Sequence, residues 1–304
     1  MRNWRNALVV LVVCAATATS ASAQQELKWK FKKGDKFYQE TAAAMKQTIT
    51  ISGQVQNQDL EQVTISSFSV EQAPPDGNLI LEQKVESVRI SGSAPLGAAQ
   101  KAMDALQGTT FKITLGDKYQ VTVFDGYEDF LKKVGGDDPL VGKMVRTTMS
   151  QDTLKKAIEE SFTFLGSDPR KPGSEWKRDS TLSLGPLGTI ISSHTYTYEG
   201  NENRNNRPIA KIGVTANLTY QAPKGEAASG LNFQITKGEL KTQSAKGTIW
   251  FDNSAGRLAE SEMRMHLKGT LTVSANGQDF PMDLNQEQVV RVRLTDQPPL
   301  PPTK

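Results

Sequence analysis

The sequence has almost no cysteine and very little histidine. Its 304 residues include one cysteine, Cys14, and two histidines, His194 and His266, in distant parts of the chain. A disulfide needs two cysteines, and a zinc site needs three or four ligands, usually with some at close spacing. The composition therefore excludes an intramolecular disulfide or a thiolate cluster and argues against a metal site.

Common catalytic and cofactor motifs are also missing. The chain has no Gly-x-Ser-x-Gly elbow, no Gly-x-Gly-x-x-Gly turn and no phosphate-binding loop. Ser193 and His194 are adjacent, but neighbours in a strand point to opposite faces. We expect no cofactor and no hydrolase triad.

Acidic pairs are the remaining candidates for acid–base chemistry, because such pairs can come from distant strands. Each has a structural interpretation: Asp137 and Asp138 as a helix cap, Glu159 and Glu160 as a solvated helix face, and Asp125 with Glu128 as a capping box. These interpretations favour a protein that is not an enzyme.

The chain has little excess charge and no apolar run long enough to cross a bilayer. It contains 36 basic and 33 acidic residues, without the basic excess typical of nucleic-acid binding. The longest apolar stretch, residues 7–16, is well short of the roughly 20 residues of a membrane helix. We expect no nucleic-acid partner and no transmembrane anchor.

The N-terminus has the pattern of a signal peptide. Arg2 and Arg5 precede the apolar stretch, and Ala21 and Ala23 fit the small-x-small cleavage site. Residues 1–23 are predicted to be removed on export, which places the protein in the periplasm or outside the cell. Cys14 could instead end a lipidation box, but the Val13 before it is not the usual Gly, Ala or Ser.

Apolar and polar residues alternate along much of the remaining chain, which predicts strands with one buried and one solvated face. In one strand, Met263, Met265, Leu267, Leu271 and Val273 share a face, opposite Glu262, Arg264, His266, Lys268 and Thr272. Two further sets are predicted to share faces: Met45, Ile49, Ile51 and Val55; and Met282, Leu284, Val290, Val292 and Leu294, interrupted by Gln286 and Gln288.

Helical spacing appears in the middle of the chain. It predicts a helix from Tyr127 that ends at Gly135 and Gly136, a second run from Asp138 to Phe162, and a shorter helix over 95–107. The predicted fold is α+β: a large antiparallel sheet, curved into a half-open barrel, with helices packed on its apolar face. We predict one domain over 24–296, a helical insert at about 125–165, and a proline-rich tail over 297–304.

Short segments carry a family resemblance. Residues 27–38, Gly173 to Trp176, and Phe251-Asp252 followed by Gly256 to Leu258 resemble a family of uncharacterised exported proteins of planctomycete-type bacteria. That resemblance implies no known activity and no catalytic residue. The order of strands, helices and strands also resembles the half-open barrels of periplasmic lipoprotein carriers, which hold acyl chains in an apolar concavity, but folds do not fix function.

The first functional hypothesis is a non-catalytic envelope protein that binds a lipid or another apolar molecule in a groove. Flexible methionine side chains suit an adaptable lining, and we expect Met45, Met144, Met263, Met265 and Met282 to provide it. Trp29, Trp176 and Trp250 are expected to be core residues rather than a ligand surface. The alternatives are a structural or interaction module that binds another envelope protein through an edge strand or through the loops at 201–207 and 223–229, and an unrecognised enzyme. The oligomeric state stays open.

Overall fold

The computed structural model describes residues 24–74, 77–94, 98–136, 139–166, 168–223 and 233–299. The predicted leader, including Ala21 and Ala23, lies outside these ranges, as do Asp137, Asp138 and residues 300–304 of the predicted tail. Most of the predicted loop at 223–229 lies outside them too. The predicted domain boundaries stay predictions.

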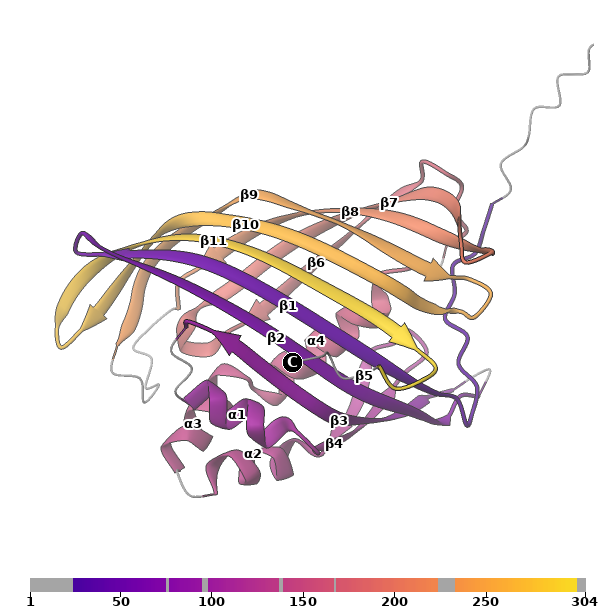
Figure 1. Ribbon diagram of the computed structural model, residues 1–304, viewed down its shortest axis with the longest axis horizontal. Helices are drawn as coiled ribbons and strands as arrows, with labels where there is room; N and C mark the ends of the chain where they lie inside the picture. Colours follow the sequence, from indigo (N-terminus) through magenta and orange to yellow (C-terminus); the bar gives the residue numbers. More distant parts are fainter. Residues whose placement is uncertain are drawn as a thin grey trace, which may run out of the picture.

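Eleven strands of the described chain form one antiparallel sheet (Figure 1). Its order is β5-β4-β3-β2-β1-β11-β10-β9-β8-β7-β6, so β5 and β6 are the two edges and the sheet stays open. This confirms the predicted fold class. The strands are β1 Lys36–Ile51, β2 Gln54–Gln72, β3 Leu79–Gly92, β4 Thr110–Leu115, β5 Val121–Asp125, β6 Glu175–Ser183, β7 Thr189–Arg204, β8 Arg207–Gln221, β9 Gln234–Asp252, β10 Arg257–Ala275 and β11 Gln278–Thr295.

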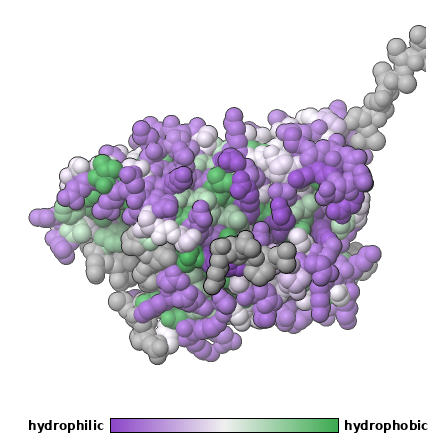
Figure 2. All heavy atoms as spheres, viewed as in Figure 1, coloured by the Kyte–Doolittle hydropathy of each residue, from purple (hydrophilic) through white to green (hydrophobic). Residues whose placement is uncertain are grey.

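The strand register separates two faces. Phe37 pairs with Phe68, and both are buried, so every second residue from them defines what we call the inner face. The predicted face of Met263 in β10 and that of Leu284 in β11 both belong to the inner face. The opposite, outer face carries most of the charged residues of the strands, although Arg178 of β6 lies on the inner face. Figure 2 shows hydrophilic residues over most of the surface seen in that view.

One predicted face was wrong. Val55 does not continue the row of Met45, Ile49 and Ile51, because the chain turns at Ser52 and Gly53, both with positive φ. Val55 is instead the second residue of the next strand, pairs with Thr50 on the outer face and is 62% exposed.

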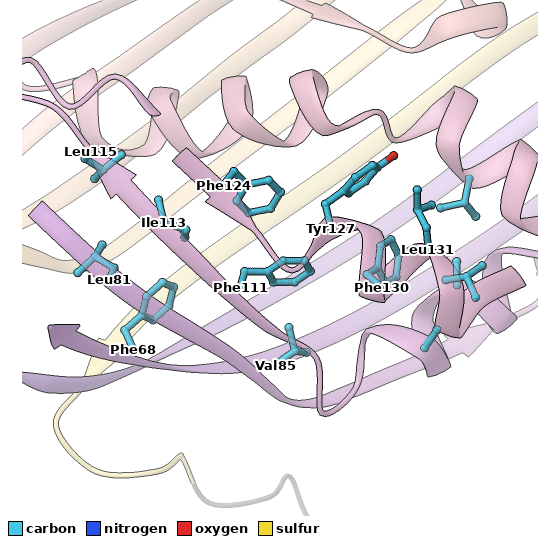
Figure 3. Close-up of a cluster of buried hydrophobic side chains, with 14 of the residues drawn as sticks. Phe68, Leu81, Val85, Phe111, Ile113, Leu115, Phe124, Tyr127, Phe130 and Leu131 are labelled. Carbon is cyan, nitrogen blue, oxygen red and sulfur yellow. The ribbon is translucent and has the colours of Figure 1, made fainter. Parts of the chain in front are cut away.

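In the described ranges, four α-helices accompany the sheet: α1 Ala98–Leu106, α2 Tyr127–Gly135, α3 Pro139–Thr148 and α4 Gln151–Thr163. α1, α2 and α3 lie together beside β3 and β4 (Figure 1). α2 buries Tyr127, Phe130, Leu131 and Val134, the positions that its helical spacing predicts. Figure 3 shows Tyr127 and Phe130 close to Phe111 of β4, and the ring centroids of Phe111 and Phe130 are 6.3 Å apart. Each buried side chain stabilises the fold by about 1.5–3 kcal/mol.

The start of α2 differs from the predicted capping box. Asp125 is the last residue of β5, and the N-cap is Gly126, with φ of 95° and no side-chain hydrogen bond. Glu128 instead forms two hydrogen bonds of 3.0 Å with Arg146 of α3, whose guanidinium holds the pKa of the Glu128 carboxyl below its usual value. The strand-to-helix turn is too tight for a capping side chain.

The second helical run is interrupted. α3 ends at Thr148 and α4 begins at Gln151, because Ser150 adopts an extended conformation and its hydroxyl accepts a hydrogen bond from the Thr153 N–H. Serine is a favoured N-cap, so a local signal for this break was present in the sequence. The break separates α4 from the other three helices.

Among the described residues, two large hydrophobic cores and a small cluster of Tyr220, Ile235 and Leu271 lie on the inner face. The first joins β1 to β5 with α1, α2 and α3. The second joins β6 to β9 with Leu27 and Trp29 of the N-terminal segment and with Phe164 and Leu165 after α4. Phe31, Tyr119 and Phe162 contact both cores. Between the two cores, α4 stands over a part of the inner face that neither core fills.

Candidate ligand-binding cavity

A cavity of about 590 Å³ lies between α4 and the inner face of the sheet. Its volume is within the range of small-molecule sites, about 300 to 1,000 Å³. The sheet supplies a floor from β1, β2, β3, β9, β10 and β11, including Val292, Leu294, Ile249 and Leu258. α4 supplies Leu154, Ala157, Ile158, Glu160 and Ser161, and α1 supplies Met103 and Leu106.

Aromatic rings from distant segments form one wall of the cavity. The indole N–H of Trp29 donates a 2.8 Å hydrogen bond to the Phe162 carbonyl, and the two ring centroids are 5.3 Å apart. Phe31 stacks on Trp29 at 5.6 Å, and Phe164 meets it edge-on at 5.8 Å. We call Trp29, Phe31, Phe162 and Phe164 the aromatic wall. Its mutual contacts and hydrogen bond fix an apolar surface before any ligand arrives.

α4 is attached to both edges of the sheet. On the β5 side, the Val121 N–H donates to Glu159 at 2.7 Å, and the Gln151 amide donates to the Phe124 carbonyl at 2.8 Å. On the β6 side, the Thr153 hydroxyl donates to the Ser183 carbonyl at 3.0 Å. α4 contains no fully buried residue, so these polar contacts make a large contribution to its position.

The two acidic residues of α4, Glu159 and Glu160, therefore have different roles. The sequence predicts a solvated helix face for both residues, but Glu159 binds the edge of β5, whereas exposed Glu160 lies at the cavity. Burial raises the pKa of Tyr196, which also lines the cavity, to about 12, and the nearby Glu160 carboxylate acts in the same direction. Tyr196 is therefore uncharged near neutral pH.

The predicted methionines lie elsewhere. Met45 and Met265 flank Gln288 on the inner face, Met263 packs against the second core, and Met282 packs against a small cluster around Leu271. Met144 belongs to α3. Their role as ligand-lining residues stays a prediction. Sequence reasoning missed Met103 and Met149, which do line the cavity, although Met103 fell on a predicted helix.

The three tryptophans differ in environment. Trp176 is a core residue, as expected, and its indole N–H donates to the Phe164 carbonyl at 2.6 Å. Trp29 is buried but also lines the cavity. Trp250 lies on the outer face, where the Arg204 guanidinium lies 4.5 Å from its ring centre. Of the three, only Trp29 contributes to this site.

The two histidines lie on opposite faces of the sheet. His194 is on the inner face, stacked against Tyr196, and burial lowers its pKa. His266 is on the outer face, 2.7 Å from the Asn285 side-chain oxygen. They cannot share a ligand. Ser192 shares a face with His194, but its hydroxyl is bonded to Ser180 at 2.6 Å.

Comparison with known proteins gives a family match over most of the chain. The family of unknown function DUF6263 matches residues 62–278, which include α4, the floor strands β3, β9 and β10, part of β2 and most of the cavity-lining residues, but not β1 or the lining residues of β11. The chain belongs to this family. The match agrees with the expected resemblance to uncharacterised proteins, while the expected origin in planctomycete-type bacteria stays a prediction. No curated protein matches the sequence of this DUF6263 member.

Solved structures resemble it only distantly. The structure of lipovitellin, solved to study lipid–protein interactions, has 8% identity and a TM-score of 0.43; the match covers 90% of this chain but 27% of lipovitellin. A Bacteroides fragilis protein with a YmcC-like fold has 9% identity and a TM-score of 0.27, covering 89% and 99% of the two chains. A Vibrio parahaemolyticus domain assigned to outer membrane lipoprotein sorting has 6% identity and a TM-score of 0.15, covering 82% and 84%. Within the described ranges, no helix is long and apolar enough to span a membrane.

Proposed function

We propose that this DUF6263 protein is exported to the cell envelope, where it binds a lipid or another apolar molecule in the cavity under α4 without chemically changing it. The observation that carries the proposal is the cavity itself, in which aromatic and aliphatic side chains surround about 590 Å³. When an apolar ligand covers this apolar surface and displaces water from it, the free energy of the system falls, which favours binding.

The ionisable groups around the cavity support binding rather than catalysis. Among the described lining residues, Glu160 is the one carboxylate, and it is exposed. Acid–base hydrolysis normally uses two carboxyl groups, or a carboxyl group with another group tuned to titrate near neutral pH. Tyr196, with a pKa of about 12, is poorly suited to that second role.

The test is native mass spectrometry of the exported protein, before and after extraction with organic solvent. We expect a stoichiometric lipid-like mass that is lost on extraction and returns on exposure to an envelope lipid extract. An unoccupied protein that takes up no lipid would contradict the proposal, and crosslinking in the envelope would then look for a protein partner.

A cavity-filling variant tests whether the bound lipid lies in this cavity. Ser261 lies on the inner face of β10 and lines the cavity, so Ser261→Trp is expected to fill part of it and abolish or greatly reduce the bound lipid. The matched control is Lys268→Trp, which places the same side chain on the outer face of the same strand. Equal lipid content in both variants would place the ligand elsewhere.

A further inference from the structure

The floor of the cavity has a polar patch inside an otherwise apolar surface. The strand register places these polar residues on the inner face. Gln39 lies two residues after the buried Phe37, and Ser66 lies opposite Gln39 on the neighbouring strand. Ser261 reaches the same surface from β10. We call this set the polar floor; its cavity-lining members are Gln39, Gln62, Thr64, Ser66, Gln83 and Ser261.

The three glutamines of the polar floor are ordered by hydrogen bonds to neighbouring side chains of the inner face. The Gln39 amide donates to Thr41 at 3.2 Å, the Gln62 amide to Thr64 at 3.1 Å and the Gln83 amide to Ser66 at 3.2 Å. A glutamine side chain has two N–H donors and a carbonyl oxygen with two lone pairs. Each glutamine therefore keeps hydrogen-bonding capacity for a ligand after its neighbour is satisfied.

The polar floor offers hydrogen bonds but no positive charge. Among the described side chains that line the cavity there is no lysine, arginine or histidine, and the one charged group is the Glu160 carboxylate. A carboxylate or phosphate placed here would lose its hydration without gaining a cation, which costs far more than burying a neutral group that finds hydrogen bonds. Glu160 would repel the anion as well.

We propose that the ligand is an uncharged amphiphile, in which an apolar chain lies along the aromatic wall and a neutral ester, amide or hydroxyl group pairs with the polar floor. The inference rests on the proposed binding function and specifies its ligand class. It separates neutral lipids from free fatty acids and anionic phospholipids, which have equally apolar chains.

The experiment compares monolaurin with laurate, which have the same acyl chain and differ in the charge of the head. Both are titrated at pH 8, below their micelle concentrations, into delipidated exported protein, with calorimetry and intrinsic tryptophan fluorescence as readouts. We expect monolaurin to bind more tightly by about tenfold or more, because the ionised carboxylate finds no cation in the cavity.

Two neutral sources share the proposed chemistry, free glycerides and acylated peptides. A lauroyl amide of an uncharged dipeptide, added to the same series, distinguishes them: tighter binding than monolaurin indicates an acylated peptide, and weaker binding indicates a free lipid. Laurate binding as tightly as either would overturn the neutral-ligand inference but leave the apolar-binding function intact. Binding of none of the three would count against the proposed function itself.

A variant that adds a positive charge to the cavity tests whether the head group contacts the polar floor. Gln39→Lys adds a cation to the polar floor and removes one of its amides, so it is expected to raise laurate affinity by about tenfold and to lower monolaurin affinity. Thr50→Lys adds the same charge on the outer face of the same strand and is expected to change neither. Unchanged laurate binding in a correctly folded Gln39→Lys protein would show that the polar floor does not contact the head group.

Discussion

The Glu159 carboxylate of α4 accepts a 2.7 Å hydrogen bond from the backbone N–H of Val121, the first residue of edge strand β5. An edge strand leaves such groups unpaired unless something covers them. Here a helix side chain replaces the missing neighbouring strand, and the same helix forms one wall of the cavity.

Replacing Glu159 is expected to loosen α4. Glu159→Ala leaves a half-buried N–H without its partner, which should lower the free energy of unfolding by about 1–3 kcal/mol. Urea denaturation measures the loss, and hydrogen exchange at the Val121 amide should accelerate. Glu160→Ala, at the next and exposed position, should change stability by less than about 0.5 kcal/mol. Similar losses in both variants would argue against the contact.

Fixing α4 to β6 is expected to slow the release of bound ligand. Thr153 and Ser183 are linked by a 3.0 Å hydrogen bond, and the native cysteine lies in the predicted leader. A Thr153→Cys, Ser183→Cys double variant, joined by a short thiol crosslinker, should therefore release a dodecyl fluorophore more slowly than before crosslinking. The single variants treated with the same reagent are the controls. An unchanged release rate would mean that ligand leaves without separation of α4 from β6.

Gly126→Ala is expected to destabilise the turn into α2 strongly. Gly126 has φ of 95°, and an added Cβ would collide with the Thr110 carbonyl oxygen. We expect a loss of about 2–4 kcal/mol, since strain and collision add. Gly34 has nearly the same φ, 91°, and a Cβ added there would meet no atom within 4 Å, so Gly34→Ala should show the backbone strain alone, about 1–2 kcal/mol. Equal losses in chemical denaturation would show that the collision relaxes.

The raised pKa of Tyr196 predicts that the protein loses stability at alkaline pH. The Tyr196 pKa rises from 10.0 when unfolded to about 12 in the fold, so the unfolded chain loses this proton first as the pH increases. The stabilisation is fully present below pH 10 and is lost between pH 10 and about 12, by roughly 2–3 kcal/mol. Tyr196→Phe removes this component, so the stability difference between wild type and variant should shift by that amount across the same interval. A constant difference would contradict the buried phenol.

The sequence was sufficient for those features that depend on local periodicity. Alternation identified the inner-face residues of β10 and β11, and helical spacing identified the buried residues of α2. Short-range signals were weaker at turns, where Gly126 rather than a capping box begins α2 and Val55 falls beyond a turn.

The location of the cavity required distances that the sequence does not contain. β10 has 19 residues and extends for about 60 Å, whereas the 13 residues of α4 extend for about 20 Å. Alternation shows that Met265 faces inward, but not whether that part of the strand lies under the helix. The contact of Trp29 with Phe162 joins residues 133 positions apart, and no local pattern predicts it.

The attachment of α4 to both sheet edges links ligand binding to resistance to aggregation. Any displacement of α4 that opens the cavity also uncovers the Val121 N–H on one edge and the Ser183 carbonyl on the other. Exposed edge groups can pair with strands of another chain. The proposed ligand, by holding α4 in place, should therefore keep the protein dispersed, and we expect the empty protein to be the form that self-associates on warming.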